Sequence, residues 1–398
     1  MLAVVAAVAV GARNGHRAEK LPAPPYAPAT AAVKPARVLA GKRPRTGHFE
    51  YLVLDGSFEV RDIDHGQKLV ERVALPATSA GVRGATMAPH SRILYVSYGG
   101  DGAGFGHGSL LAFDLVSQKV LWQRDYPTGI DSMAITPDGK TIYMPVGEAG
   151  YDHEWLVIRA SDGYVTTQIV AGTAPHNTVV SLDGTRVYLG GRDGNELEVA
   201  DTKTNQIVQK IGPMKSGVRP FTINKAQTLA YTTATGFLGF QVSSITTGKV
   251  LYTVTFKGFS WNPDTFSSSA PSHGISLSPD EREVWVIDGP NSYVHVFDVS
   301  GVPAHPPVEV ADLKLAHGIV GKEVGCPYDC NRSGWVQHSR DGRFVYIGDS
   351  GDVFSTKTRK IVAYLPAMRE TRKTIEIDWQ GGVPVATTTR QGLGYGKR

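Results

Sequence analysis

Residues able to carry charge or transfer protons recur at one position relative to a repeated turn in this chain. Counting seven residues back from the turn aspartate, or from its equivalent, gives Arg83, Asp131, His176, Arg219, His273 and Gly334. The same count in the last segment reaches Arg372 and Lys373. Histidine exchanges protons near neutral pH, and arginine suits carboxylate recognition. We therefore predict one catalytic group, formed by His176, His273, Arg219, Arg83 and Asp131.

β-Elimination on a uronate-containing saccharide is the leading chemistry for this group. Arg83 and Arg219 would neutralise the substrate carboxylate and make the neighbouring C–H bond more acidic. His176 or His273 would take that proton, and a tyrosine or the other histidine would protonate the leaving oxygen. A lyase acting on an acidic sugar is therefore the predicted function.

Three alternatives stay open from the residues alone. His176, His273 and Asp131 would suit a divalent metal with an open position for water, although the sequence requires no cofactor. Lactone hydrolysis would need a similar base, with Arg219 as the donor to an oxyanion. A non-enzymatic protein would use the same face to bind an anionic ligand or another protein.

Four long loops are predicted to surround this face, since long loops on a rigid scaffold commonly carry binding residues. They span residues 99–108, 147–153, 258–272 and 317–333. Loops and ring together supply the predicted substrate-binding residues, which are Lys373, Arg372, Trp335, His107, His153 and Trp261. His90, His295 and His338 lie at strand or turn positions, so we predict structural roles for them.

The elements that position these residues come from a sequence repeat. The phrase reads TPDGKTIY at 136–143, SLDGTRVY at 181–188, SPDEREVW at 278–285 and SRDGRFVY at 339–346. Its aromatic anchors recur every 43 to 61 residues, at Tyr51, Tyr95, Tyr143, Tyr188, Tyr231, Trp285 and Tyr346. Short alternating strands at such a period indicate a β-propeller with one four-stranded blade per repeat. We predict an all-β, seven-bladed propeller.

Ring closure is predicted from a segment without a blade of its own. The first repeat begins at its second strand, YLVL at 51–54, and so lacks an inner strand. The strand-like segment TIEIDW at 374–379 can supply it, which would remove two exposed sheet edges. The segment at 383–388 has no predicted partner.

The repeats resemble a known family at two places. TVVSLDGTRVYLG at 178–190 and VHVFDVS at 294–300 are similar to the YVTN-type β-propeller repeat family. The resemblance covers about residues 50–380 and implies the propeller architecture. It implies little about function, because such propellers include binding modules, lactonases and lyases.

Composition describes a globular body with a basic tail. The chain has 398 residues, 41% of them hydrophobic and 20% charged, and we assign residues 47–398 to a single propeller. Residues 1–46 hold eight Lys or Arg against Glu19, so the remainder carries a net charge of −3 although the whole chain carries +4. An acidic body argues against nucleic-acid binding. We expect a monomer that binds a small molecule or saccharide at the channel mouth.

The N-terminal segment suggests export. Residues 2–12, LAVVAAVAVGA, have the length of a signal-peptide apolar region, although no basic residue precedes them. We predict a signal segment at 1–17, a Pro/Ala/Arg-rich linker at 18–46, and a secreted or periplasmic protein. No apolar run approaches the roughly 20 residues that span a bilayer. In an exported protein, Cys326 and Cys330 favour a small disulfide loop.

Overall fold

The computed structural model describes most of the predicted propeller. Its described residues are 36–75, 81–99, 108–147, 153–266, 268–322 and 331–388. The predicted signal segment, His107, Cys326 and Cys330 lie outside these ranges. Among the described residues, no helix is long and apolar enough to cross a membrane.

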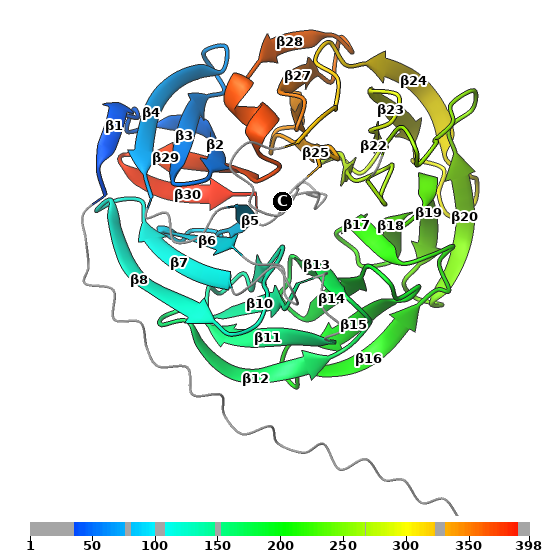
Figure 1. Ribbon diagram of the computed structural model, residues 1–398, viewed down its shortest axis with the longest axis horizontal. Coiled ribbons are helices and arrows are strands. Elements are labelled where there is room, and N and C mark those ends of the chain that lie inside the picture. The colour runs from blue at the N-terminus through cyan, green and yellow to red at the C-terminus, as the bar shows by residue number, and fades with distance from the viewer. Residues whose placement is uncertain are drawn as a thin grey trace, which may run out of the picture.

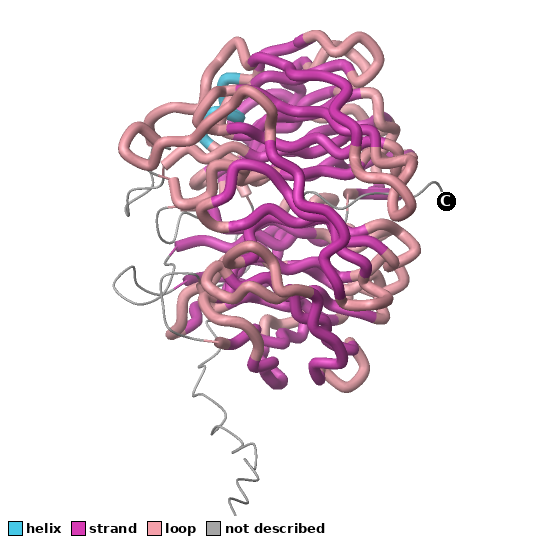
Figure 2. The backbone as a smooth tube through the Cα atoms, turned by 90° about the vertical axis from the view of Figure 1, so that its right-hand side faces the viewer, coloured by secondary structure: helices cyan, strands magenta, loops and turns pink. Residues whose placement is uncertain are grey.

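Seven antiparallel sheets surround a central axis, as Figure 1 shows. Figure 2, a view from the side, shows strands running through the thickness of the disc and loops on both faces. The chain is therefore an all-β, seven-bladed propeller, as predicted. We number the blades along the chain, beginning with the sheet that contains β2.

The strands of blades 2 to 4 follow the predicted repeat. Blade 2 contains β5 (Val82–Thr86), β6 (Ile93–Gly99), β7 (Gly108–Asp114) and β8 (Lys119–Tyr126). Blade 3 contains β9 (Ala134–Ile135), β10 (Thr141–Pro145), β11 (Glu154–Arg159) and β12 (Tyr164–Val170). Blade 4 contains β13 (Pro175–Val180), β14 (Arg186–Gly191), β15 (Leu197–Asp201) and β16 (Gln206–Ile211).

Blades 5 to 7 repeat the same order. Blade 5 contains β17 (Val218–Ile223), β18 (Leu229–Ala234), β19 (Phe237–Ser244) and β20 (Lys249–Thr255). Blade 6 contains β21 (Ile275–Leu277), β22 (Glu283–Asp288), β23 (Tyr293–Asp298) and β24 (Val308–Lys314). Blade 7 contains β25 (Trp335–His338), β26 (Phe344–Gly348), β27 (Asp352–Ser355) and β28 (Ile361–Tyr364), and the 3-10 turn η2 (Pro366–Glu370) follows it.

Blade 1 closes the ring by joining the two ends of the chain. Its strand order is β1 (Val38–Gly41), β4 (Lys68–Ala74), β3 (Ser57–Asp62), β2 (Gly47–Leu54), β29 (Thr374–Gln380) and β30 (Val383–Thr387). The pairing of Tyr51 with Ile375 places β29 beside β2 and confirms the predicted closure. β30 pairs with β29 and accounts for the segment without a predicted partner. β1 shows that the last part of the predicted linker pairs with β4.

The aromatic anchors of the repeat join one blade to the next. All seven are buried, with exposed fractions of 5% or less. Four hydroxyl groups donate hydrogen bonds across a blade boundary: Tyr95 to the Ala160 carbonyl, Tyr143 to Asn205, Tyr188 to Gln227, and Tyr346 to Gln67. The last of these bonds crosses from blade 7 to blade 1. The anchor therefore buries a large ring between blades and also satisfies its polar end.

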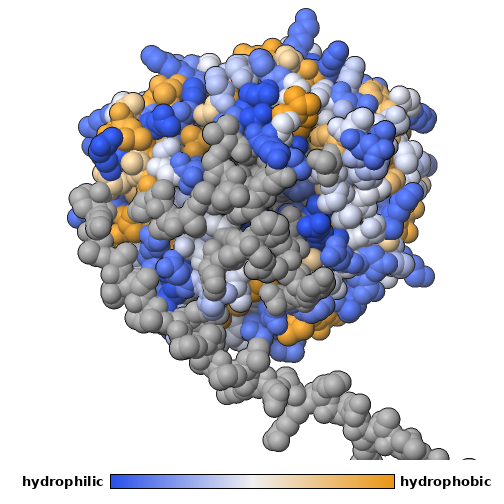
Figure 3. All heavy atoms as spheres, viewed as in Figure 1, coloured by the Kyte–Doolittle hydropathy of each residue, from blue (hydrophilic) through white to orange (hydrophobic). Residues whose placement is uncertain are grey.

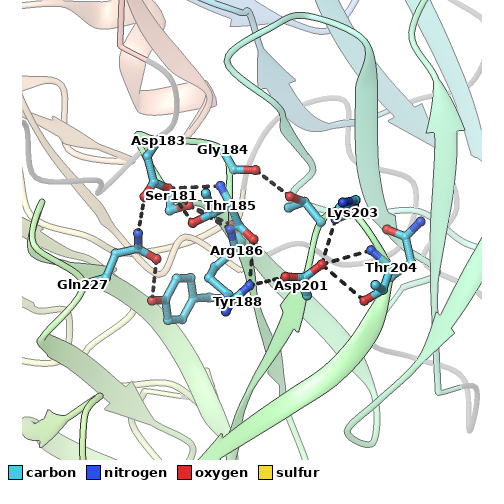
Figure 4. Close-up of polar contacts among 12 residues, drawn as sticks. Ser181, Asp183, Gly184, Thr185, Arg186, Tyr188, Asp201, Lys203, Thr204 and Gln227 are labelled. Carbon is cyan, nitrogen blue, oxygen red and sulfur yellow. Dashed lines mark hydrogen bonds and ion pairs between the residues drawn. The ribbon is translucent and has the colours of Figure 1, made fainter.

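Figure 4 shows how the repeated phrase forms its turn in blade 4. The Ser181 hydroxyl donates to Asp183 at 2.7 Å and accepts the backbone N–H of Arg186 at 3.0 Å. Gln227 of blade 5 donates to Asp183 at 2.9 Å and accepts from Tyr188. Side chains thus satisfy the turn's backbone and connect it to the next blade, which explains why the phrase recurs.

One face of the disc carries a mixture of apolar and polar residues. Figure 3 shows hydrophobic and hydrophilic residues interspersed over the described part of the face that it draws. The apolar side chains that fill the blades form several buried clusters, such as the one that includes Tyr51, Phe58 and Phe113. These clusters hold the blades rigid, so residues at the beginnings of the inner strands have fixed positions.

Candidate functional site

The predicted ring residues lie where the chain enters the inner strands. Arg83, His176 and Arg219 lie on β5, β13 and β17, while Asp131 and His273 precede β9 and β21. Gly334 directly precedes β25, and Arg372 and Lys373 directly precede β29. Each blade therefore contributes one or two of these residues at the beginning of its inner strand.

Asp131 is shared between two of its predicted partners. Its Oδ2 atom lies 2.6 Å from Nδ1 of His176 and 3.1 Å from Nη2 of Arg83. The exposed fractions of Arg83, Asp131 and His176 are 8%, 2% and 5%. A backbone bridge between Ser132 and Asn177 holds the two segments side by side. A carboxylate in this position orients the imidazole and keeps Nδ1 as a donor.

His273 connects this group to the C-terminal side of the ring. Its imidazole lies 5.6 Å from that of His176, measured between ring centres. Nδ1 of His273 lies 3.3 Å from the Gly334 carbonyl oxygen and 3.4 Å from Nη1 of Arg372. The structure thus brings together two histidines from blades 4 and 6 and an arginine from the closing segment. We call Arg83, Asp131, His176, His273 and Arg372 the mouth cluster.

Asp349 is a member of this region that the sequence analysis missed. Its Oδ2 atom accepts the backbone N–H groups of Ser333 and Gly334, at 2.7 and 3.0 Å, and lies 3.6 Å from Nε of Arg372. Asp349 is fully buried and follows β26. A signal was present, because Asp349 lies three residues after the anchor Tyr346. The spacing that locates the ring residues does not reach Asp349, because this aspartate follows the second strand of its blade.

Arg219, Lys373 and Trp335 lie around the same channel end. Nη2 of Arg219 donates to the Ser269 hydroxyl at 2.7 Å, which fixes the arginine against the segment leading into blade 6. Nζ of Lys373 lies 5.8 Å from the centre of the Trp335 ring, close enough for a cation–π contact. The same indole forms a T-shaped contact with the His273 ring, with ring centres 5.9 Å apart. Trp335 therefore links the lysine to the mouth cluster.

Positive charge predominates among the described residues at the channel end. Within this part of the chain, four cations accompany two carboxylates, Asp131 and Asp349; the cations are Arg83, Arg219, Arg372 and Lys373. When both histidines are neutral, the group keeps two excess positive charges. Since little of it is exposed to water, an anionic ligand there would be attracted more strongly than at an open surface.

Two predicted binding residues do not join the cluster. His153 is exposed, and its backbone N–H donates to Glu154. The indole of Trp261 donates to the Phe266 carbonyl within its own loop. In the part of the chain that the structure describes, neither residue forms a hydrogen bond with the mouth cluster.

The predicted metal ligands are not gathered either. Among the described residues, the set of three potential ligands whose atoms lie within 4.8 Å of one another is His295, Glu309 and Asp312. His176, His273 and Asp131 do not form such a set, because Asp131 contacts one histidine and the other lies beyond it. The geometry of the mouth cluster fits hydrogen bonding and proton transfer better than metal coordination.

The histidines expected to be structural lie away from the cluster. His90 has a φ of 58° in the turn between β5 and β6. Nδ1 of His338 lies 2.9 Å from the Ser276 hydroxyl of the neighbouring blade. Burial lowers the pKa of His338 to about 3, so this histidine is neutral at physiological pH. His295 lies within blade 6 beside acidic residues.

Comparisons with known proteins support the architecture. No protein-family model matches this chain, and no curated protein matches it. The structure is similar to a chain of hydrazine synthase from Kuenenia stuttgartiensis, with a TM-score of 0.55 and 15% sequence identity. The match covers 80% of this chain and 98% of that chain. At this level of identity the likeness concerns the seven-bladed propeller fold alone.

Proposed function

We propose that the channel mouth is the active site of a lyase that cleaves an acidic saccharide by β-elimination. The observation that carries the proposal is the sharing of Asp131 Oδ2 between His176 and Arg83. It combines an oriented imidazole with a cation that can face a substrate carboxylate. Both are needed when a proton is removed from the carbon next to a carboxylate.

His176 is the proposed base. Because Nδ1 donates to Asp131, the neutral imidazole carries its acceptor lone pair on Nε2. In the reaction, Nε2 takes the proton from the carbon bearing the uronate carboxylate. The electron pair of that C–H bond forms a carbon–carbon double bond, and the glycosidic oxygen on the next carbon leaves with its own bonding pair. Asp131 stabilises the imidazolium that results.

The cations stabilise the charge that develops during this step. As the proton leaves, negative charge moves onto the substrate carboxylate, where Arg83 and Arg219 are the proposed partners. His273, close to Arg372, is the proposed acid that gives a proton to the leaving oxygen. Lys373 and Trp335 would bind a further part of the saccharide, the first by charge and the second by stacking.

The proposal can be tested with the full-length protein and a panel of uronate-containing oligosaccharides. Elimination conjugates the new double bond with the carboxylate, so ultraviolet absorbance follows the product directly. We expect absorbance to rise with the wild-type protein and to stay flat with His176→Gln and Asp131→Asn. His317→Gln is the matched control, because His317 also pairs with a carboxylate, Asp352, at 2.7 Å but lies outside the mouth cluster.

Binding measured separately distinguishes a catalyst from a binding protein. Calorimetry with the same oligosaccharides reports affinity whether or not a bond is broken. Binding without any rise in absorbance would contradict the lyase and leave an anion-binding propeller. Neither binding nor absorbance across the panel would reject the acidic-saccharide class.

A further inference from the structure

A second group of ionisable residues lies inside blade 6, apart from the mouth cluster. His295 on β23 is fully buried, and its Nδ1 lies 2.6 Å from Oδ1 of Asp312 and 3.4 Å from Oε1 of Glu309, both on β24. Its other nitrogen, Nε2, lies 3.2 Å from Oδ2 of Asp288 at the end of β22. All three potential ligand atoms of His295, Glu309 and Asp312 lie within 4.8 Å of one another.

A β-bulge brings the two carboxylates onto one side of the sheet. His295 pairs with Asp312 and Val296 with Ala311, but Phe297 pairs with Glu309, so one residue of β24 is left over. Residues three apart on a regular strand point to opposite faces, whereas the extra residue restores both to the same face. Glu309 and Asp312 therefore both face His295.

The other six blades provide an internal comparison, because each has a register shift at the same place. At the position of Glu309 they carry apolar residues: Leu69, Val120, Val165, Ile207, Val250 and Ile361. At the positions of Glu309 and Asp312, blade 2 has Val120 and Gln123, and blade 3 has Val165 and Gln168. The fold thus does not need a carboxylate here. Blade 6 alone combines a histidine with two carboxylates at these positions.

One proton on Nδ1 cannot satisfy both carboxylates. The short contact to Asp312 uses the N–H bond, and Oε1 of Glu309 is buried without a hydrogen-bond partner. The carboxylates of Asp288, Glu309 and Asp312 lie 3.2, 3.4 and 2.6 Å from the nitrogens of the His295 imidazole, so three acidic groups surround one ring. A divalent cation at this point would balance the charge and satisfy all three ligand atoms.

We propose that His295, Glu309 and Asp312 bind a divalent metal ion and that Zn²⁺ is the ion this ligand set suits. Imidazole and carboxylate ligands are typical of zinc, and three protein ligands leave a fourth position for water. Asp288 is the positioning residue, because its hydrogen bond to Nε2 directs Nδ1 toward the metal. Asn291 in turn donates to both Asp288 oxygens, at 2.9 and 2.8 Å.

Such a site would fasten the segment that leads from blade 5 into blade 6. Phe256 stacks on His295 with ring centres 3.9 Å apart, and Phe259 meets it edge-on at 4.6 Å. The same segment continues to Ser269, which holds Arg219, and then to His273. A metal that fixes His295 therefore stabilises the path to the channel end. This inference does not depend on the proposed lyase activity.

Zinc titration of the full-length protein, stripped of metal with a chelator, tests the proposal. The decisive variant is the double substitution Glu309→Val and Asp312→Gln, which copies blades 2 and 3 and so keeps residues that this fold accepts. We expect the wild type to bind one more equivalent of Zn²⁺ than the double variant. Asp288→Asn is expected to keep the equivalent but to weaken its affinity by roughly 10–100-fold. Asp264 is an exposed carboxylate in the segment between blades 5 and 6. The variant Asp264→Asn is expected to bind zinc as the wild type does.

A direct spectroscopic measurement keeps the test valid if the double variant does not fold. In the wild type, Zn²⁺ is expected to shift the ¹⁵N resonance of His295 Nδ1, whereas Mg²⁺, which prefers oxygen ligands, is not. Equal zinc stoichiometry and affinity in the wild type and a folded double variant would overturn the proposal. An unchanged His295 resonance would also overturn it. In that case a proton shared by the carboxyl groups of Glu309 and Asp312, and not a metal, would occupy the site.

Discussion

Two buried groups of ionisable residues in this propeller are balanced in opposite ways. In the mouth cluster, Asp131 contacts Arg83 and His176, and Asp349 beside the cluster contacts Arg372, so both carboxylates have cationic partners when they are ionised. At the closing seam between β2 and β29, Glu50 pairs directly with Glu376, and Asp378 lies two residues further along. The difference teaches that burial alone does not make a functional site. The sign of the surrounding charge decides whether a group binds an anion or holds a proton.

The seam is arranged to keep its two glutamates protonated. Burial raises the pKa of Glu50 to about 8, and the charge of Asp378 adds to this effect. Burial, together with Asp378 and Glu50, also raises the pKa of Glu376 well above its ordinary value. Arg340 compensates only in part, through its backbone N–H to Glu376 and its guanidinium to Asp378. The strands that close the ring therefore meet across protonated glutamates.

The largest effect on stability is expected from removing the shared carboxylate of the mouth cluster. Asp131→Ala takes from Arg83 and His176 their common partner while both stay buried. Breaking a buried pair on one side costs about 3–5 kcal/mol of unfolding free energy. Urea denaturation measures this loss, with Asp264→Ala as the exposed control. A loss no greater than that of the control would show that the mouth cluster does not depend on charge balance.

The seam should respond in the opposite direction, so Glu50→Gln is expected to stabilise the protein at neutral pH. Below pH 4.5 the glutamate is protonated in both the folded and the unfolded chain. Its titration then costs the wild type no unfolding free energy. As the pH rises from 4.5 to about 8, only the unfolded chain releases the proton, which costs about 1.4 kcal/mol per pH unit. The amide cannot titrate, so the gain at pH 7, 2.5 pH units above 4.5, should be about 3.4 kcal/mol.

Melting temperatures of the wild type and Glu50→Gln, measured from pH 4.5 to 8, test this sign. The two curves should separate as the pH increases and run parallel above about pH 8. Glu196→Gln, which removes a half-exposed carboxylate paired with Lys210, should follow the wild type over the whole range. Curves for Glu50→Gln that converge with rising pH would mean that Glu50 is ionised in the folded protein.

A smaller effect, on binding rather than folding, is expected from Lys373→Met. This change removes one of the cations at the channel end but keeps a long apolar side chain beside Trp335. A charge-assisted contact to a ligand carboxylate contributes about 1.5–3 kcal/mol, so affinity for an acidic saccharide should fall at least about tenfold. Calorimetry at two salt concentrations measures this loss and should show a weaker salt dependence in the variant. Unchanged affinity would place the ligand away from Lys373.

The fold was predictable because the same sequence pattern recurs in each blade. Anchors such as Tyr143 and Tyr188 mark the second strand of each blade, and the residue before each inner strand follows from the same register. This register was sufficient to place His176 and His273 together, although 97 residues separate them in the chain. A repeating scaffold converts sequence spacing into spatial proximity.

Contacts that are not repeated from blade to blade were not predictable in this way. Asp349 reaches Arg372 only because the chain returns to close the ring, and Glu50 meets Glu376 for the same reason. The bulge recurs in every blade, but only blade 6 places Glu309 and Asp312 opposite a histidine, so the repeat did not indicate their contact with His295. The location of a loop residue such as Trp261 could not be predicted, because the position of a loop depends on its own contacts, here the bond to Phe266.

The smallest expected effects compare an ordinary blade boundary with the closing seam. Tyr188→Phe removes a hydroxyl that donates to Gln227 between blades 4 and 5, and Tyr346→Phe removes one that donates to Gln67 between blades 7 and 1, both at 3.1 Å. A neutral hydrogen bond contributes about 1 kcal/mol, so each variant should lose about that much unfolding free energy. The carboxyl groups of Glu50 and Glu376 also act electrostatically on Tyr346. The loss of unfolding free energy in Tyr346→Phe should therefore change with pH, whereas the loss in Tyr188→Phe should stay constant. Denaturation of both variants at pH 5 and pH 8 decides this, and equal pH dependence would mean that the seam carboxyls do not sense Tyr346.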